Sequence, residues 1–499
     1  MPPQTLAAVA TLLSFAHHGN RVEFQLDHGS AELVWITPST FRFRRALEGP
    51  LAEIKIEDRG AVSIKIEETS GRVTVRSPLL EVSLEKSGLL AHVRRNDGTA
   101  LLADLSEPRE SGAGVTWDRQ APAEARFYGL GPRTDLVLDL RGKSVPAEAP
   151  FLICTAGYGE YHNLPGLYRF DFTEPNRYRI QAPAVDYYFY YGPTVKQIFE
   201  EHRSNARGAS WNAATDRFGS WSALRSTLLR LVSGAMSAMN APALALQPYE
   251  GAPAELARRA RQLGSLVDDV SPGPLGLSDF RKQLETFFAV YAVETRDKGF
   301  PLWHPLPFQF PDDPECARHA DEFMLGDEML IAPICEPGGK RSVYLPQGVW
   351  TNLETNEAIA GRRTITMDTP ALPVFARNGS IVPLDSAGGM ALHYFPKLAA
   401  EFFLLESDNQ EWTQVHASPA GDEMRLEIEA KKTHDYQWVV HHIERPKEVR
   451  VVAGEAPAPP HRAGESPAPP WFYDAAHKNL NVRVHVAARE DSILNVIFP

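Results

Sequence analysis

The chain is poor in several features that would define its class. Its 499 residues include only three cysteines, Cys154, Cys316 and Cys335. They are odd in number and far apart, so the sequence offers neither a disulfide framework nor the paired spacing of a zinc site. No apolar run reaches the roughly 18 residues of a membrane-spanning helix. We therefore expect no disulfide, no bound metal and no membrane partner.

Positive charge is also in deficit. Lys and Arg number 51 against 63 Asp and Glu, which gives a formal net charge of −12. A protein that binds nucleic acid needs a basic face, so nucleic acid is not an expected partner. The sequence also lacks a P-loop, a GxGxxG turn, an HExxH pair and Ser-His-Asp spacing. We therefore expect no cofactor.

The longest apolar stretch near the start covers residues 6–16. It has the length of a signal-peptide core, but no Lys or Arg precedes it. We therefore expect a first helix or strand packed on the body of a cytoplasmic protein, with secretion as the alternative.

The first part of the chain, to about Tyr191, has a β pattern. Hydrophobic residues make up 43% of the chain, which is enough for large buried cores. Short segments alternate apolar and polar residues, which indicates strands with one buried face. Turns at Gly29, Gly71 and Asp97-Gly98 separate regularly spaced short strands and so predict a β-sandwich. The clearest expected strands are 21–26, 62–66 and 72–76.

From about Val195 onward the pattern becomes helical. Apolar residues recur at the spacing of a buried helix face, and Ser278 is a candidate N-cap for the last helix. Helices that alternate with short apolar segments such as 329–332 suit β/α units. Strands return at about 342 and continue to the end, with a loop or linker rich in Pro and Ala at 457–470. The expected helices are 195–203, 221–236, 253–266 and one whose buried stripe is Leu284, Phe287, Phe288 and Tyr291.

Short motifs, in a fixed order, connect these regions to one family. Together they resemble glycoside hydrolase family 31 over nearly the whole chain. In chain order, the motifs are FYGLG at 127–131, LDLRG at 138–142, PFLI at 150–153, GYG at 157–159, DYYFYYGP at 186–193, GFPLWHPL at 299–306, DEFMLGD at 321–327, LIAP at 330–333, VYLP at 343–346, GVW at 348–350 and PVFARNGSIVP at 373–383.

The resemblance implies an N-terminal β-sandwich, a (β/α)8 barrel and two C-terminal β domains. It also implies retaining cleavage of α-glycosides by two carboxylates. The middle is too short for that barrel, because residues 193–336 number 144 and a full barrel needs about 200 or more. We therefore predict a multidomain α+β protein with a truncated barrel remnant. Its expected domains are a β-sandwich at 1–192, the remnant at 193–336, and β-sandwich domains at 337–385 and 386–499.

The resemblance implies that the missing part carries the nucleophile, which lies in a Trp-x-Asp-x-Asn-Glu strand. The nearest imitation is 350–357, which follows the VYLP motif in a C-terminal domain and so cannot be that strand. Only 29 positions separate Gly192, at the exit of the sandwich, from Trp221, in a helix that resembles one late in the barrel. The first half or more of the barrel is therefore expected to be absent.

Asp216 is the one candidate for the second carboxylate, the acid/base. It precedes Trp221 by five residues, as the family's acid does, but counting from Trp211 by the family's interval reaches Ala214 instead. A solvated or helix-capping aspartate is the competing interpretation of Asp216.

Three further stretches of the family's site are changed. The family's Asp-Ile-Gly-Gly-Phe stretch falls on 244–249, where the carboxylate is replaced by apolar residues. Its Arg-x-His falls on 271–273, which is Ser-Pro-Gly. The sandwich loop at 144–149 has Glu148 as its only acid.

Other constellations have simpler interpretations. Adjacent acids point apart on a strand or a helix, so Asp268-Asp269 and Asp312-Asp313 are not obvious catalytic pairs, and the second is expected to be structural. Histidines at 17–18 and 441–442 lack flanking ligands and are expected to be solvated. His304, where the family has Arg, is expected to pack in a core. The aromatic rings of Trp211, Phe218 and Trp221 could stack on sugars, but core packing is favoured.

Three functions remain open. The first is a non-catalytic homologue that binds carbohydrate or another protein. The second is an active retaining α-glycosidase with a rebuilt site, in which Asp216 is the acid and Glu250, Asp268 or Asp269 its partner. The third is a scaffold subunit of a full-length relative. Since a partial barrel exposes sheet edges, helices between 195 and 298, the flanking sandwiches or a second copy in a homo-oligomer are expected to cover them.

Overall fold

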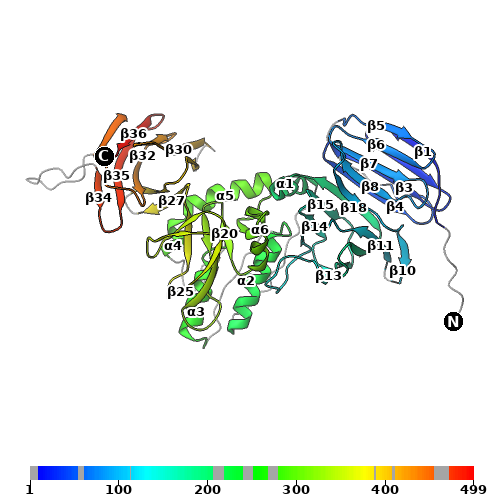
Figure 1. The fold of residues 1–499 in the computed structure, drawn as a ribbon, viewed down its shortest axis with the longest axis horizontal. Helices are drawn as coiled ribbons and strands as arrows, with labels where there is room; N and C mark the ends of the chain where they lie inside the picture. The colour runs from blue at the N-terminus through cyan, green and yellow to red at the C-terminus, as the bar shows by residue number, and fades with distance from the viewer. Residues whose placement is uncertain are drawn as a thin grey trace, which may run out of the picture. The chain divides into compact units, whose positions relative to one another are not determined.

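The computed structural model describes residues 9–53, 61–112, 114–205, 219–239, 251–267, 279–386, 389–406, 411–454 and 471–499. The chain divides into two compact units, each described by itself. Unit 1 comprises Met1–Ser210, Ser233–Asn240 and Lys298–Phe300, and unit 2 comprises Trp211–Val232, Ala241–Asp297 and Pro301–Pro499. Most of the secondary structure is β-sheet (Figure 1).

Unit 1 is built from three antiparallel sheets that share one apolar core. The eight-stranded sheet contains, in order, β1 (Leu12–His18), β2 (Arg21–Leu26), β3 (Ser30–Thr37), β4 (Thr40–Ala46), β18 (Val185–Tyr191), β15 (Tyr158–His162), β14 (Phe151–Cys154) and β12 (Phe127–Gly129). The second sheet contains β10 (Arg109–Ser111), β11 (Gly114–Gln120), β17 (Arg177–Ala182), β16 (Tyr168–Asp171) and β13 (Ser144–Ala147).

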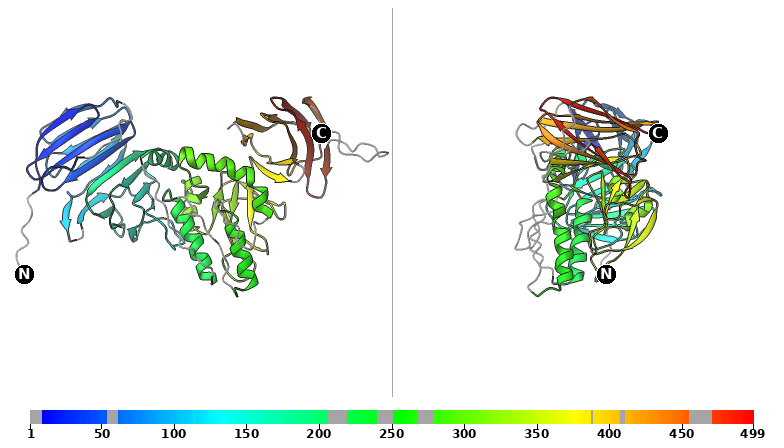
Figure 2. Two further views of the ribbon diagram at one scale, coloured as in Figure 1. Left: turned by 180° about the vertical axis from the view of Figure 1, so that it is seen from behind. Right: turned by 90° about the vertical axis from the view of Figure 1, so that its left-hand side faces the viewer.

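The third sheet of unit 1 lies beside strands β1–β4 in both Figure 1 and Figure 2. The expected strand at 62–66 begins later, at Lys65, because its hairpin partner β6 ends opposite that residue at Arg76. The expected strands at 21–26 and 72–76 are confirmed as β2 and β6. The third sheet contains β5 (Lys65–Glu68), β6 (Arg72–Arg76), β7 (Leu80–Glu85), β8 (Ala91–Arg95) and β9 (Ala100–Ala103).

The expected helices are confirmed with small shifts at their ends. Ser278, the candidate N-cap, lies outside the described residues. Leu284 forms a turn just before α5, and with Phe287, Phe288 and Tyr291 it is buried, as the helical stripe predicts. The helices are α1 (Val195–Asn205), α2 (Trp221–Ala235), α3 (Ala254–Gly264), α4 (Asp279–Gln283), α5 (Glu285–Lys298), α6 (Leu306–Gln309) and the 3-10 helix η1 (Pro314–Arg318).

A six-stranded sheet and a two-stranded ribbon share a core in unit 2. The sheet includes strands from both sides of the domain boundary predicted at 336. Strands β19, β20 and β21 precede this boundary, and β23, β24 and β26 follow it. The sheet contains β19 (Trp303–Pro305), β20 (Phe323–Leu325), β21 (Met329–Ile331), β26 (Val374–Arg377), β23 (Val349–Asn352) and β24 (Ala358–Ala360), and the ribbon pairs β22 (Lys340–Leu345) with β25 (Arg363–Asp368).

The interpretation of residues 329–332 as a strand of a β/α unit is wrong. Strand β21 pairs antiparallel with β20 on one side and with β26 on the other. A short apolar run is equally compatible with parallel and antiparallel neighbours when both faces are buried. Among the strands that the structure describes, only β28 and β32, in the last sheets, pair in parallel.

Two five-stranded sheets complete unit 2, as the β pattern of the last part of the chain predicts. The loop predicted at 457–470 lies outside the described residues. One sheet contains β27 (Ser380–Ser386), β28 (Gly389–Phe395), β32 (His434–Val440), β35 (Asn479–Val486) and β34 (Trp471–Asp474), and the other β29 (Ala400–Glu406), β30 (Glu411–Ala420), β31 (Glu423–Glu429), β36 (Asp491–Ile497) and β33 (Glu448–Ala453).

Helix α3 is fastened to the loop after β25 by one buried arginine. Arg259 is 2% exposed, and its Nη1 donates to the carbonyl oxygens of Ala371 (2.8 Å) and Pro370 (3.1 Å). Its Nη2 donates to the carbonyl oxygen of Thr369 at 2.8 Å. The guanidinium therefore satisfies carbonyl groups that no strand partner reaches.

Replacing Arg259 with Met should lower the free energy of unfolding by about 2 kcal/mol, because the apolar stem is kept but buried carbonyls lose their donors. Hydrogen exchange over α3 and residues 369–371 measures the effect. The neighbouring Arg258→Met is the control, since the Arg258 side chain is 47% exposed and paired only at the surface. Equal effects of the two changes would show that Arg259 has no special role.

Candidate functional site

Most of the sequence-predicted catalytic positions cannot be placed. Asp216 and the alternative partners Glu250, Asp268 and Asp269 lie outside the described residues. So do Trp211, Ala214, Phe218 and the changed stretches 244–249 and 271–273. Glu148 is described and lies on the surface of unit 1.

The nucleophile-like segment 350–357 belongs to a hairpin of the six-stranded sheet. Strand β23 pairs antiparallel with β24, and the Trp350 indole donates to the carbonyl oxygen of Pro346 at 2.9 Å. The Asn352 side chain accepts from the backbone of Glu354 at 2.8 Å, which closes the turn. The Glu354 carboxylate accepts from the Thr369 hydroxyl at 2.7 Å. These contacts give the segment a turn-forming role, in agreement with its rejection as the catalytic strand.

Two neighbouring acids of unit 2, Asp321 and Glu322, lie just before β20 beside His319. One carboxylate oxygen of each lies, with a ring nitrogen of His319, within 4.8 Å of the others. The Arg341 guanidinium contacts both acids, at 2.7 Å from Asp321 and 3.5 Å from Glu322. The backbone amide of Tyr344 also donates to Glu322. A cation bound here would have to displace the guanidinium from these carboxylates.

This pair does not match the needs of a retaining glycosidase. Such an enzyme holds two carboxyls about 5–5.5 Å apart, one ionised and one protonated. Burial raises the pKa of Glu322 to about 8, although Arg341 opposes the shift. The distance between the two carboxyls and the raised pKa of Glu322 therefore come close to these requirements. However, Asp321 and Glu322 are only 8% and 0% exposed. No sugar ring can reach between them.

A second buried acid stabilises the junction of α5 and the β20–β21 turn. The Tyr291 hydroxyl donates to Glu328 at 2.6 Å, and burial raises the pKa of Glu328 to about 8. His304 is fully buried, its ring between those of Tyr291 and Phe308, with Nδ1 3.1 Å from Asp327. The core-packing interpretation of His304 is confirmed.

The expectation that histidines 441 and 442 are solvated is wrong for His441. This residue is 7% exposed, and its ring stacks on Phe395 with a centroid distance of 4.3 Å. His441 Nδ1 lies 2.9 Å from the side-chain oxygen of Asn356, and its Nε2 lies 3.0 Å from His393 Nδ1. His441 and His442 directly follow the buried strand β32. The lack of metal-ligand spacing argues against a metal site, but it does not predict whether the side chains are buried or exposed. His17 and His18 are exposed, as expected.

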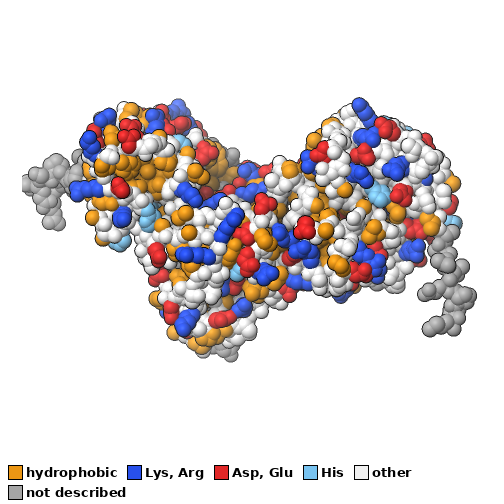
Figure 3. All heavy atoms as spheres, viewed as in Figure 1, with side chains coloured by type: hydrophobic (Ala, Val, Ile, Leu, Met, Phe, Trp, Pro, Cys, Tyr) orange, Lys and Arg blue, Asp and Glu red, His pale blue; other side chains and the backbone are white. Residues whose placement is uncertain are grey.

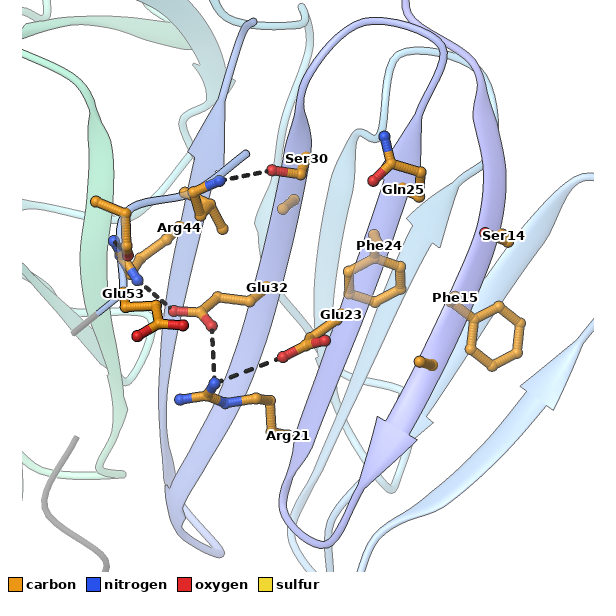
Figure 4. Close-up of a pocket in the computed structure, with 14 residues that line it drawn as sticks. Ser14, Phe15, Arg21, Glu23, Phe24, Gln25, Ser30, Glu32, Arg44 and Glu53 are labelled. Carbon is orange, nitrogen blue, oxygen red and sulfur yellow. Dashed lines mark hydrogen bonds and ion pairs between the residues drawn. The ribbon is translucent and has the colours of Figure 1, made fainter. Parts of the chain in front are cut away.

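A hollow of about 510 Å³ lies on unit 1, over the outer side of β1–β4 (Figure 4). Its floor is a chain of ion pairs in which Glu32 contacts Arg44 at 2.6 Å and Arg21 at 3.7 Å. Arg21 also contacts Glu23 at 3.5 Å. These charges satisfy one another, so the hollow presents an internally paired surface.

The described part of unit 2 also has hollows, of which two bear on the site. One of about 400 Å³ is lined by Arg225, Cys335 and Lys340 beside the Asp321–Arg341 ion pair. Burial raises the pKa of the Cys335 thiol to about 12, which leaves it unreactive. The other, of about 480 Å³, lies between the segment from α6 to η1 and the β22–β23 turn. We call it the α6–η1 hollow.

Asp313 at the α6–η1 hollow has the structural role that the sequence predicts for the 312–313 pair. Its carboxylate accepts from the backbone of Glu315 at 3.1 Å, which caps η1. It also accepts from the Tyr344 hydroxyl at 2.8 Å. The neighbouring Asp312 is exposed. The sequence did not predict this hollow, because its two walls are far apart along the chain.

Charge is mixed over the face of the molecule in Figure 3, where acidic and basic side chains are interspersed. No helix among the described residues is long and apolar enough to cross a membrane.

Comparisons with known proteins find similarity to glycoside hydrolase family 31 over part of the sequence. The model of the glycosyl hydrolase family 31 C-terminal domain matches residues 299–382. An alpha-glucosidase of Saccharolobus solfataricus is 36% identical over 130 residues, which cover 24% of this chain and 19% of that protein. Alpha-glucosidase 2 of Bacillus thermoamyloliquefaciens is 38% identical over 104 residues, 20% of this chain and 13% of that protein. The chain thus spans less than a fifth of the length of these curated relatives.

Solved structures resemble the whole chain. A Flavobacterium johnsoniae GH31 dextranase, solved as a mutant with isomaltotriose, has a TM-score of 0.83 at 14% identity, over 98% of this chain and 100% of that one. The glucosidase II alpha subunit has a TM-score of 0.74 at 10% identity, over 99% and 97%. At such identities the likeness concerns the fold.

Proposed function

We propose that this chain is a member of glycoside hydrolase family 31 and a non-catalytic homologue whose retained β domains bind carbohydrate or a protein partner. Carbohydrate is the favoured ligand, since the similar proteins are named as glucosidases and a dextranase. The proposal concerns a role in which the sugar is held and not cleaved.

One observation carries this proposal. Residues 193–336 number 144, and the strands described there are the three short strands β19, β20 and β21. All three pair antiparallel with their neighbours, whereas a (β/α)8 barrel is made of parallel strands and takes about 200 residues or more. A barrel remnant without its first half supports the loss of the nucleophile.

The chemistry explains why such a loss is decisive. A retaining glycosidase needs a carboxylate nucleophile in addition to the acid/base. Asp216 would supply at most general acid catalysis, typically worth 10²–10⁴-fold, whereas complete enzymes accelerate reactions by about 10⁶-fold or more. An acid alone cannot form and release a covalent glycosyl intermediate.

Release of nitrophenol from aryl α-glucosides and α-xylosides by the full chain tests the proposal. We expect the rate in buffer to be unchanged by the protein and by its Asp216→Ala variant. Asp385→Ala serves as the matched control in an active preparation, since Asp385 caps α5 through Thr286 at 2.8 Å and is not a candidate catalytic acid. Turnover that Asp216→Ala abolishes and Asp385→Ala preserves would overturn the proposal.

That outcome would favour the alternative of an active α-glycosidase with a rebuilt site. The specific observation in its favour is that the curated relatives carry the names of active enzymes. Its partner carboxylate would then be sought among Glu250, Asp268 and Asp269.

A further inference from the structure

We propose that the α6–η1 hollow of unit 2 is a carbohydrate-binding site, an inference that rests on the proposed carbohydrate-binding function. The side chains that carry it are Gln309, Phe310, Asp312, Tyr344, Gln347 and Arg362. The site is independent of the missing part of the barrel. Each of these residues belongs to the segment from α6 to η1 or to the strands and turns of the six-stranded sheet and its two-stranded ribbon.

The hollow has the size and stiffness of a ligand site. Its volume of about 480 Å³ falls within the ~300–1,000 Å³ typical of pockets that bind small molecules. Pro311 and Pro314 fix two backbone φ angles in its wall, and Asp313 ties that wall to Tyr344. A wall held in place before binding lowers the ordering cost that a ligand must meet.

The polar groups suit neighbouring hydroxyls. Gln309 and Gln347 each offer a planar amide, Asp312 a carboxylate and Arg362 a guanidinium, so donors and acceptors stand side by side. The Gln309 side-chain oxygen is enclosed and has no hydrogen-bond partner among the described residues. A ligand hydroxyl can donate to this oxygen only after the groups that enclose it have moved, and buried acceptors are normally paired.

Arg362 is held in a strained position at the rim. Its φ angle is 57°, in the left-handed region that favours glycine, and its Nη2 donates to the Gln347 side-chain oxygen at 2.7 Å. The contact fixes the amide of Gln347, so that its NH₂ group is left to donate to a ligand.

An aromatic ring supplies the apolar part of the wall. Phe310 is partly exposed, and its ring packs edge-on against Trp350 with a centroid distance of 6.1 Å. The Arg377 guanidinium lies 5.3 Å from the Phe310 centroid, which fixes the ring from another side. The C–H face of a pyranose packs on such a ring while its hydroxyls meet amides and carboxylates. Opposite charges at Asp312 and Arg362 favour a neutral ligand over a phosphate.

Saturation-transfer NMR and calorimetry of the full chain, with isomaltotriose and maltotriose as the probes, test the site. We expect one of the two sugars to bind, and Gln309→Leu and Asp312→Asn each to weaken binding by about tenfold, the loss expected for one or two hydrogen bonds. Asp422→Asn, in an exposed turn between β30 and β31, is the matched control and should leave binding unchanged. Asp312 is exposed, so its variant keeps the test valid even if Gln309→Leu fails to fold.

The outcomes separate the site from the function. Sugar binding that neither variant weakens would overturn this inference and leave the proposed function standing. No binding of either sugar by the unaltered chain would overturn both this site and carbohydrate as the ligand. Loss of binding in the two variants but not in Asp422→Asn supports the site.

Discussion

Replacing Arg119 with Met should lower the free energy of unfolding of unit 1 by about 3–5 kcal/mol, the usual cost of breaking a buried ion pair from one side. Arg119 is fully buried on β11, where it pairs with Glu160 on β15 and, at 2.8 Å, with Asp104. It therefore connects all three sheets of unit 1. The change would leave two carboxylates in the core without their cation.

The ionisation of Glu160 shows how much this pairing matters. Burial is the largest single influence on Glu160 and opposes its charged form, but Arg119, His162 and Tyr178 together outweigh burial and lower the pKa of the carboxyl to about 2. The Tyr178 hydroxyl adds a hydrogen bond to Glu160 at 2.7 Å. A carboxylate kept charged in an apolar core in this way depends on its arginine.

Urea denaturation, monitored by hydrogen exchange in β11 and β15, measures the effect of Arg119→Met. The control is Arg179→Met, on the neighbouring strand β17, where an exposed pair with Asp118 at 2.8 Å is worth less than about 1 kcal/mol. Adding Glu160→Leu to Arg119→Met should recover part of the loss, because it removes an unpaired charge. Equal losses for Arg119→Met and Arg179→Met would contradict the prediction.

Mild acid should destabilise the last two sheets of unit 2 by about 3 kcal/mol between pH 6.5 and 5. Burial lowers the pKa of His393 to about 4 and that of His441 to about 2. Both values lie below the unfolded value near 6.5, so only the unfolded chain takes up protons in this interval. The stability that the two neutral rings contribute is therefore complete well above pH 6.5 and is lost as the pH falls, at a rate that approaches about 1.4 kcal/mol per pH unit for each histidine below about pH 5.5.

The contacts explain why neither ring accepts a proton. The Asn356 amide nitrogen donates to the carbonyl oxygen of His477 at 2.9 Å, which turns the Asn356 oxygen toward His441. His441 must then donate from Nδ1 and accept at Nε2 from His393. Protonation of His441 at Nε2 would place two N–H groups face to face, whereas for His393 it is burial that opposes the charged ring.

Hydrogen exchange in β28 and β32, at pH 6.5 and pH 5, measures this loss. The double variant His393→Gln, His441→Gln should show a flatter dependence on pH in these strands. His485→Gln, whose side chain is 49% exposed beside Asp435, is the control and should keep the original dependence. A double variant as sensitive to pH as the unaltered chain would assign the effect to other groups.

Local alternation predicted most strands and helices, because burial of one face leaves a clear period in β2, β6 and α5. It failed for Met329–Ile331, since an apolar strand buried on both faces carries no sign of its neighbours' direction. It also failed for His441, whose burial depends on rings from another strand. The family motifs carried more information, because they fixed the order of the domains.

The α6–η1 hollow could not be predicted from the sequence. Gln309 and Asp312 are close in the chain, but Tyr344 and Arg362 reach them only through the pairing of β22 with β25. Asp312 and Asp313 show the limit clearly: the sequence predicts a structural role for both, and the hydrogen bonds support it for Asp313. The catalytic prediction for Asp216 remains a prediction.

The proposed absence of a catalytic nucleophile is tested most directly by covalent trapping. A fluorinated α-glucosyl fluoride reacts with the nucleophile of a retaining glycosidase and leaves a long-lived glycosyl–enzyme, because fluorine slows its hydrolysis. After prolonged incubation of the full chain, intact-mass spectrometry should show an unchanged mass. A stoichiometric increase by one fluoroglucosyl group, mapped to a single carboxylate, would contradict the proposal that this chain has lost its catalytic half.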